Sequence, residues 1–308
     1  MNVTVVGLGL IGGSVLRALD ASGHRVTGHD PQAAEAAEAD GFTIAGTLED
    51  AVRDADLVVL AVPLPALPPI VDALADFPGL VTDVTSVKGP VRELAKKLPR
   101  FVGGHPMTGK ETSGFAASEA TLFGGCSWVL CLEPGETRLD DWLTLAALFT
   151  GLAARVVPVT AEEHDRAVAQ VSHVPHLFAT ALAGRLKDNP LAGALAAGSF
   201  RDGTRVAATR AELIAAMCGG NAPAVGTELD RLITELQEVR ALLDAPDPVA
   251  ALLPALRPAV DLRRAWPSRA GEVTDVPAEI GALLDLGRAG GWVTAVNKTT
   301  VEAIRPEN

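Results

Sequence analysis

The sequence has few cysteines, no long uninterrupted hydrophobic run and no excess of basic residues. Its three cysteines, Cys126, Cys131 and Cys218, lack metal-like spacing, which predicts free thiols, a reducing compartment and no bound metal. The longest apolar candidate, residues 57–71, contains four prolines and is shorter than the roughly 20 residues that a bilayer crossing needs. The sequence therefore predicts no membrane segment.

The net charge, the first residues and the length of the chain limit which kinds of protein it can be. A net charge of −12 would repel phosphate backbones, so we expect no nucleic-acid partner. The first residues run into a glycine-rich turn without a basic segment, which predicts no secretory signal and a cytoplasmic location. A length of 308 residues exceeds one ordinary compact domain and predicts two.

A glycine-rich turn follows the first β-branched run. Residues 3–6 favour a strand, and Gly7-Leu8-Gly9-Leu10-Ile11-Gly12 then leads into an apolar helical pattern. In dinucleotide-binding folds one glycine makes the turn, a second lets the backbone approach a pyrophosphate, and a third lets the helix pack close to the strand. The spacing therefore predicts that Gly7, Gly9, Leu10, Ile11 and Gly12 form a cofactor site at a helix amino terminus.

An acidic residue follows this turn at the distance that a dinucleotide requires. Asp30 comes directly after a second predicted strand, residues 25–28, and about 20 positions beyond the glycines, where ribose hydroxyls would be bound. A carboxylate there would repel a 2′-phosphate, so Asp30 favours NAD over NADP. Alternatively, Asp30 only caps the turn that precedes Pro31.

Strands and helices then alternate through the amino-terminal half. Residues 33–39 and 47–55 favour helices, and residues 56–63, 80–84 and 101–104 favour strands, which predicts a parallel sheet with both faces covered. In such sheets ligands bind outside the carboxyl ends of the strands. Pro63, Ser86 and His105 follow three of these strands, so we expect them beside a nicotinamide.

The carboxy-terminal half has a helical pattern. Thr160 and Glu163 form a predicted capping box that opens a long helix through about residue 186, within which Pro175 should cause a kink. A second helix at residues 223–243 is amphipathic and suits packing across a dimer. We therefore expect a dinucleotide domain at residues 1–158 and a helical domain at 159–308, of which about 246–308 is a weakly patterned extension.

Five motifs together resemble those of the prephenate/arogenate dehydrogenases, in the same order and over roughly residues 1–245. They are residues 6–14, Asp83-x-x-Ser86-Val87-Lys88, His105-Pro106-Met107-Thr108-Gly109 with Glu111 and Ser113-Gly114, Ser172-His173-Val174-Pro175-His176, and residues 200–207. The resemblance implies an α/β fold, with a Rossmann-type parallel-sheet domain followed by an all-helical domain that forms a homodimer. It also implies NAD-dependent oxidative decarboxylation of prephenate to 4-hydroxyphenylpyruvate in tyrosine biosynthesis, or of arogenate to tyrosine.

The same resemblance implies roles for individual residues. His105 would act on the ring hydroxyl of the substrate with Ser86 hydrogen-bonding nearby, while Ser172, His176 and Arg205 would line the substrate pocket. The chemistry suits a histidine, because a base of near-neutral pKa must take the hydroxyl proton as hydride leaves the same carbon.

Plainer interpretations exist for some of these residues. Ser86 could be a helix cap and Lys88 a solvated charge, and His173 could be a buried structural histidine. Arg201 and Arg210 are expected at the surface. His173 and His176 have helical spacing, but no carboxylate or cysteine partner lies nearby in the sequence, so we expect no metal site there.

Two other functions fit parts of the sequence. A 3-hydroxyacid dehydrogenase would be expected to carry a lysine base in the second domain, and the helix that holds Ser172 and His176 has none at the required place. A non-catalytic NAD-sensing regulator could lack one of Ser86, His105 and Arg205, so the presence of all three favours catalysis. The chain has Leu213-Ile214 where family members often carry tryptophan, and residues 276–283 are too short to establish an amino-acid-sensing ACT module.

Overall fold

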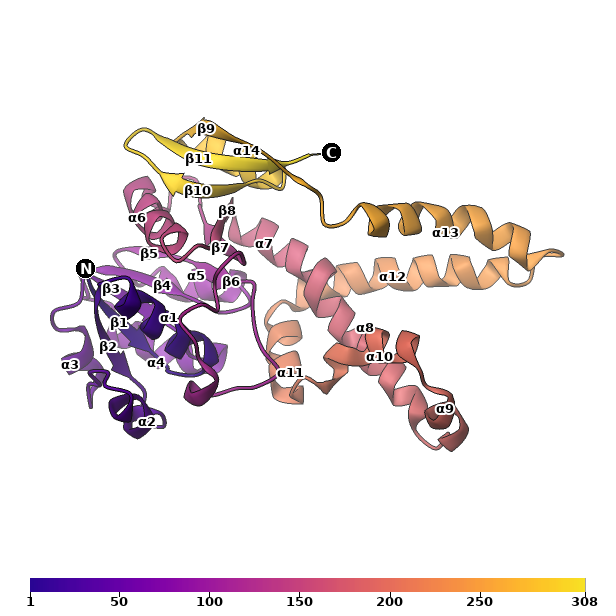
Figure 1. Ribbon diagram of the computed structural model, residues 1–308, viewed down its shortest axis with the longest axis horizontal. Helices are drawn as coiled ribbons and strands as arrows, with labels where there is room; N and C mark the ends of the chain where they lie inside the picture. Colours follow the sequence, from indigo (N-terminus) through magenta and orange to yellow (C-terminus); the bar gives the residue numbers. More distant parts are fainter. Residues whose placement is uncertain (308) are drawn as a thin grey trace. The chain divides into compact units, whose positions relative to one another are not determined.

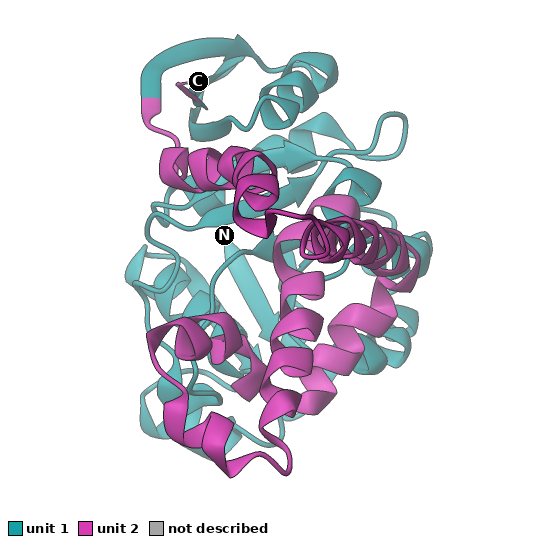
Figure 2. Cartoon of the chain, turned by 90° about the vertical axis from the view of Figure 1, so that its right-hand side faces the viewer, with its two compact units in different colours: residues 1–165, 271–305 teal, residues 166–270, 306–308 magenta. Residues whose placement is uncertain are grey.

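The computed structural model describes residues 1–307 (Figure 1). The chain divides into two compact units, which Figure 2 distinguishes by colour. Unit 1 comprises residues 1–165 and 271–305, and unit 2 comprises residues 166–270 and the last residues of the chain. Among residues 1–307, no helix combines the length and the apolar character that a membrane span requires.

The first sheet of unit 1 is parallel throughout and has the strand order β2-β1-β3-β4-β5. Its strands are β1 (Asn2–Val6), β2 (Arg25–His29), β3 (Leu57–Leu60), β4 (Leu80–Asp83) and β5 (Phe101–Val102). The connecting helices are α1 (Leu10–Ala21), α2 (Ala34–Ala39), α3 (Leu48–Val52), α4 (Leu67–Ala73) and α5 (Gly89–Ala95). Every residue of β3 and β4 is buried, as expected for parallel strands covered on both faces. The predicted Rossmann-type sheet is confirmed.

The strand order reverses at β1, because β2 lies on one side of it and β3 on the other. The connection from β1 runs through the glycine turn into α1. Such a switch point leaves a crevice outside the carboxyl ends of the strands. The glycine turn therefore lies where this fold binds nucleotides.

A second, mixed sheet completes unit 1, with the order β6-β7-β8-β10-β11-β9. Its strands are β6 (Gly104–Pro106), β7 (Ser127–Cys131), β8 (Arg155–Val159), β9 (Ala270–Pro277), β10 (Trp292–Val296) and β11 (Thr300–Pro306), with helices α6 (Leu139–Thr150) and α14 (Ile280–Arg288). Trp128 of β7 stacks on Phe149 of α6 with ring centroids 3.8 Å apart, inside the core of this layer.

The last strands correct the expected domain organisation. Residues 271–305 belong to unit 1, and residues 270–306 contain three strands, so most of the extension that was expected at about 246–308 of the helical domain instead belongs to unit 1 and its second sheet. The pairing of Val293 with Val156 joins this segment to the rest of unit 1. Residues so distant in sequence carry no local signal of their pairing, and the short strands β10 and β11 are only partly buried.

Unit 2 is built from helices. The helical run starts with α7 (Ala161–Val168), whose first residues lie in unit 1, and continues through a π-helical turn (Ala169–His173) into α8 (Val174–Ala183). The later helices are α9 (Pro190–Leu195), α10 (Gly198–Thr204), α11 (Ala211–Gly220), α12 (Ala222–Leu242) and α13 (Pro248–Ala265). Residues 198–203 include Gly198 and Gly203, a glycine content that favours a loop in the sequence, but they are helical in the structure.

The predicted capping box opens the long helix, and a π-helical turn precedes Pro175, where the sequence predicted a kink. The Glu163 backbone N–H donates to Thr160 Oγ1 at 3.2 Å, and the Thr160 N–H donates to Glu163 Oε2 at 2.9 Å, which is a capping box. The π-helical turn ends at His173, two residues before Pro175. The proline nitrogen carries no hydrogen, so it cannot donate a hydrogen bond to the preceding turn. The π geometry therefore lies at Ser172 and His173, inside one of the family-like motifs.

Candidate active site

The three motif glycines have different surroundings, which match their expected roles. Gly7 has a φ of +90°, which favours glycine, and an ideal Cβ on Gly12 would lie 1.9 Å from the Gly7 carbonyl oxygen. A Cβ on Gly9 would meet nothing within 4 Å. The turn thus needs glycine at Gly7 and Gly12 for its own packing, while open space adjoins Gly9 at the start of α1. These features fit a pyrophosphate site.

Asp30 joins the end of β2 to the glycine turn. Its Oδ2 accepts a hydrogen bond from the Leu8 backbone N–H at 2.7 Å, and its Oδ1 accepts one from the Gln32 N–H at 2.8 Å. The carboxylate therefore caps the turn at Pro31, as the plainer interpretation has it, and also contacts the glycine turn. Leu10 and Ile11 are half-buried at the start of α1, and Pro63 is exposed three residues after β3.

A buried polar cluster holds the carboxyl end of β4 against β6. Lys88 and Asp83 form an ion pair whose side chains are 1% and 0% exposed, so the interpretation of Lys88 as a solvated charge is wrong. Asp83 Oδ1 accepts from the Gly104 N–H at 3.0 Å, and Lys88 Nζ donates to the Gly104 carbonyl at 2.6 Å. Both backbone groups of Gly104 are thus held, which positions His105 next to it. Ser86 lies half-buried in the same loop.

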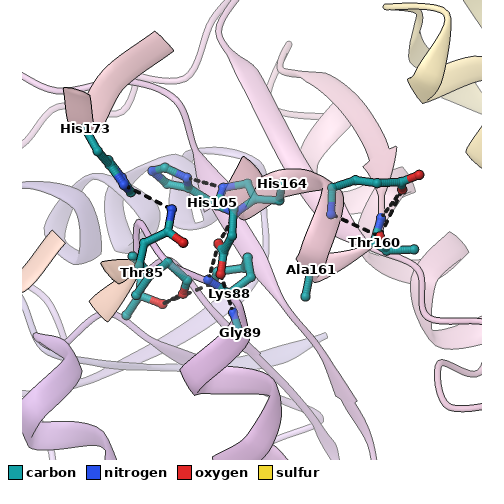
Figure 3. Close-up of polar contacts among 12 residues, drawn as sticks. Thr85, Lys88, Gly89, His105, Thr160, Ala161, His164 and His173 are labelled. Carbon is teal, nitrogen blue, oxygen red and sulfur yellow. Dashed lines mark hydrogen bonds and ion pairs between the residues drawn. The ribbon is translucent and has the colours of Figure 1, made fainter. Parts of the chain in front are cut away.

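His105 is the first member of a hydrogen-bonded series that the sequence did not reveal (Figure 3). Its Nδ1 lies 2.9 Å from His164 Nε2, and His164 Nδ1 lies 2.7 Å from Asp165 Oδ1. His105 is half-buried, whereas His164 is 2% exposed. In the sequence, the only sign of this series is that His164 and Asp165 directly follow the capping box of α7. His105, which His164 contacts, lies 59 positions earlier in the chain.

Asp165 also fixes the start of α5. Its Oδ1 accepts a hydrogen bond from the Lys88 backbone N–H at 2.8 Å and its Oδ2 one from Gly89 at 2.7 Å. Burial raises the pKa of Asp165, but the hydrogen bonds from His164, Gly89 and Lys88 outweigh it and leave the pKa below its ordinary value. Burial lowers the pKa of His164, although the hydrogen bond to Asp165 acts in the opposite direction. This arrangement favours a neutral imidazole beside a carboxylate.

The expected substrate residues lie in unit 2. Ser172 and His176 are half-buried, and His176 Nδ1 lies 2.8 Å from the Ser172 carbonyl oxygen, to which it donates. His173 is fully buried, and its Nδ1 lies 3.2 Å from Asn221 Nδ2. Arg205 is exposed and begins a short 3₁₀ turn, Arg205–Ala208, which packs against α8. Arg201 and Arg210 are exposed, as expected.

A parallel sheet with an open glycine turn at its switch point, followed by a helical unit, defines the class of two-domain nucleotide-binding dehydrogenases. Residues 15–158 match the sequence model of the prephenate dehydrogenase nucleotide-binding domain, and residues 160–252 match that of the prephenate dehydrogenase dimerization domain. The chain belongs to the prephenate dehydrogenase family. The first match begins after Gly12, so the assignment of the glycine turn rests on its geometry.

Comparisons with individual proteins of known sequence or structure support this family assignment. Prephenate dehydrogenase of Lactococcus lactis is 34% identical over 67% of this chain, which spans 61% of that relative's length. Among solved structures, Synechocystis arogenate dehydrogenase is 28% identical, with a TM-score of 0.74 over 86% of this chain and 98% of that one. Aquifex aeolicus prephenate dehydrogenase, in complex with hydroxyphenyl propionate and NAD⁺, is 25% identical, with a TM-score of 0.75 over 86% and 96%.

Proposed function

We propose that the chain catalyses the NAD-dependent oxidative decarboxylation of prephenate to 4-hydroxyphenylpyruvate, a step of tyrosine biosynthesis. The observation that carries this proposal is His105 at the carboxyl side of the sheet, held by a buried ion pair on one side and by His164 on the other. The Aquifex relative binds NAD⁺ and a hydroxyphenyl acid, which supports the same two ligand classes here.

The amino-terminal residues fit NAD. Gly9 leaves open space for a pyrophosphate, and Gly7 and Gly12 allow the tight turn around it. Leu10 and Ile11 at the start of α1, and Pro63 in the loop after β3, would flank the cofactor. The Asp30 carboxylate adjoins this turn and would bind the ribose hydroxyls, which disfavours NADP. When bound, NAD supplies the hydride acceptor.

The protein groups would handle the proton and the substrate charges. His105 takes the proton of the ring hydroxyl as hydride leaves the same carbon, and Ser86 hydrogen-bonds to that oxygen. Ser172 and His176 bind the substrate, and the Arg205 guanidinium holds a carboxylate, for which its fork geometry is suited. Loss of the ring carboxylate as carbon dioxide then makes the ring aromatic, so positioning is the main task of the protein.

Arogenate is the second candidate substrate, favoured by the likeness to the Synechocystis arogenate dehydrogenase. It differs from prephenate only in carrying an amino group in place of the side-chain keto group. The residues assigned to the ring and its hydroxyl serve both substrates equally. The choice therefore depends on contacts at the side chain.

We propose further that the protein works as a cytoplasmic homodimer formed through its helical unit. The match of residues 160–252 to a dimerization domain supports this assembly. Apolar side chains are also exposed on two helices of the single chain, namely Ile233 and Leu236 on α12 and Leu253 and Leu256 on α13. Burying them against a second copy would remove this apolar surface from water.

Steady-state NADH production with prephenate and with arogenate, measured side by side, tests the proposed function. We expect turnover with at least one of them, and the ratio of the two kcat/KM values identifies the substrate. The His105→Asn variant serves as the background. Failure of both substrates to exceed that background would refute the activity.

A further inference from the structure

Hydrogen bonds join His105 to two further titratable side chains, His164 and Asp165. This series runs from Asp165 through His164 to His105, with separations of 2.7 and 2.9 Å. A neutral imidazole has one nitrogen that donates and one that accepts, so fixing either nitrogen fixes the other. If Asp165 accepts a hydrogen bond from His164, the donor and acceptor of the next hydrogen bond, between His164 and His105, are therefore determined as well.

The first step concerns Asp165. An ionised carboxylate only accepts hydrogen bonds, and both of its oxygens already receive backbone N–H groups, from Lys88 and Gly89. The hydrogen bond between Asp165 Oδ1 and His164 Nδ1 must then be donated by His164. His164 consequently carries its proton on Nδ1, and Nε2 of its neutral form is an acceptor.

The second step concerns His105. Because His164 Nε2 accepts, His105 Nδ1 must donate to it across 2.9 Å. We propose that Asp165 and His164 set the tautomer of His105, so that its Nε2 is the basic nitrogen that takes the proton from the substrate hydroxyl. This inference rests on the proposed function, in which His105 is the base. His164 and Asp165 are positioning residues, because they act through His105.

The surroundings of His164 favour its neutral form. Burial lowers its pKa, the nearby Lys88 ammonium acts in the same direction, and the carboxylates of Asp165 and Asp83 oppose both. The two histidine rings also pack edge to face, with centroids 5.1 Å apart and planes at 76°. This packing contact holds the ring orientation of His105, whereas the hydrogen bond to His164 sets its tautomer.

The series also distributes the charge that forms during the reaction. The substrate O–H bond breaks, an N–H bond forms at His105 Nε2, and His105 becomes an imidazolium that still donates from Nδ1. Its positive charge then lies one hydrogen bond from His164 and two from the Asp165 carboxylate, which remains ionised. A histidine held by a buried acidic partner in this way recurs in hydrolytic triads, where changing the acid to an amide costs about 10⁴-fold in kcat.

Two substitutions of His164 separate tautomer control from packing. In His164→Gln the amide oxygen can occupy the position of Nε2 and accept from His105, whereas the shorter amide of His164→Asn reaches only the position of Nδ1. We expect His164→Gln to retain kcat within roughly tenfold, and His164→Asn to lose about 10²- to 10⁴-fold, with KM for NAD and substrate changed little in both. Equal losses in the two variants would overturn the proposal.

His164→Phe supplies a variant that keeps the ring volume if His164→Asn fails to fold. It retains the edge-to-face contact but offers no acceptor, so we expect the same loss of kcat as in His164→Asn. A phenylalanine variant with wild-type kcat would show that the acceptor is unnecessary.

Nitrogen-15 NMR of the histidines reports the tautomer without any turnover. The chain has 6 histidines, so His105→Asn and His164→Gln spectra suffice to assign the two signals. In the NAD-bound full-length protein we expect His105 to be protonated at Nδ1 and not at Nε2. A His105 signal protonated at Nε2 would overturn the inference even in an active enzyme. The expected tautomer in an enzyme that is inactive on both substrates would instead refute the proposed function.

Discussion

Gly12 and Gly7 approach so closely that an ideal Cβ on Gly12 would lie 1.9 Å from the Gly7 carbonyl oxygen. The contact joins the start of α1 to the end of β1 and leaves no room for a side chain. Gly9, two residues from Gly7, has open space instead. The three glycines of one motif are therefore required for two different reasons.

This difference predicts opposite effects for two alanine substitutions. Gly12→Ala should destabilise the protein by about 1–3 kcal/mol or more, because backbone must move to admit the methyl group. Gly9→Ala should keep the wild-type melting temperature but weaken NAD binding at least about tenfold, because the methyl group enters the pyrophosphate space. Calorimetry and NAD titration measure both, with Gly46→Ala, also in open space, as the control. Normal NAD affinity in Gly9→Ala would place the pyrophosphate elsewhere.

The buried pair of Lys88 and Asp83 predicts a large stability effect. Lys88→Met leaves the Asp83 carboxylate buried without its cation, which should cost about 3–5 kcal/mol. Lys96→Met removes a lysine whose side chain is 58% exposed and pairs with Glu93, so we expect about 0–1 kcal/mol. Urea unfolding compares the variants. Similar midpoints for both would mean that the ion pair contributes little.

Asp30 predicts a strong preference for NAD over NADP. In the wild type kcat/KM should be much higher with NAD, and Asp30→Ala should narrow the ratio by at least about tenfold because the 2′-phosphate is no longer repelled. NAD itself should also bind less well, since the Leu8 N–H loses its acceptor. Initial rates with the two cofactors give the ratio. Comparable values in the wild type would contradict the role of Asp30.

His105→Asn should remove most of kcat and leave NAD affinity nearly unchanged. Loss of a general base typically costs about 10²- to 10⁴-fold, and the proposed role of His105 concerns the substrate and not the nucleotide. Steady-state rates and an NAD titration by fluorescence separate the two quantities. A variant within a few-fold of the wild-type kcat would mean that another group is the base.

Arg205→Ala should raise KM for the substrate by about one to three decades, since truncating a charge partner commonly costs about 2–5 kcal/mol. Arg205→Lys should restore only part of the loss, because an ammonium lacks the two-pronged geometry. Arg201→Ala and Arg210→Ala are matched controls, as both residues are exposed in the same unit. Unchanged KM in both Arg205 variants would remove this residue from the substrate site.

Features encoded by neighbouring residues could be predicted from the sequence. The strand, glycine turn and helix at residues 2–21 follow from hydrophobic periodicity and glycine spacing. The capping box of Thr160 and Glu163 follows from two residues three positions apart, and both of its hydrogen bonds are present. Pro175 predicted a kink in its helix, and the structure has a π-helical turn shortly before this residue.

Features that join distant segments were decided only by the tertiary structure. His105 and His164 are 59 positions apart, and Asp165 meets Lys88 across 77. Val293 of β10 pairs with Val156 of β8, which moves residues 271–305 from the expected helical region into unit 1. The sequence by itself determined the local elements and the family motifs, because turns, caps and periodicity depend on contacts within a few residues. Only the folded chain could decide that His164 contacts His105, because this hydrogen bond joins the start of α7 to β6, and no local pattern in either segment encodes the pairing.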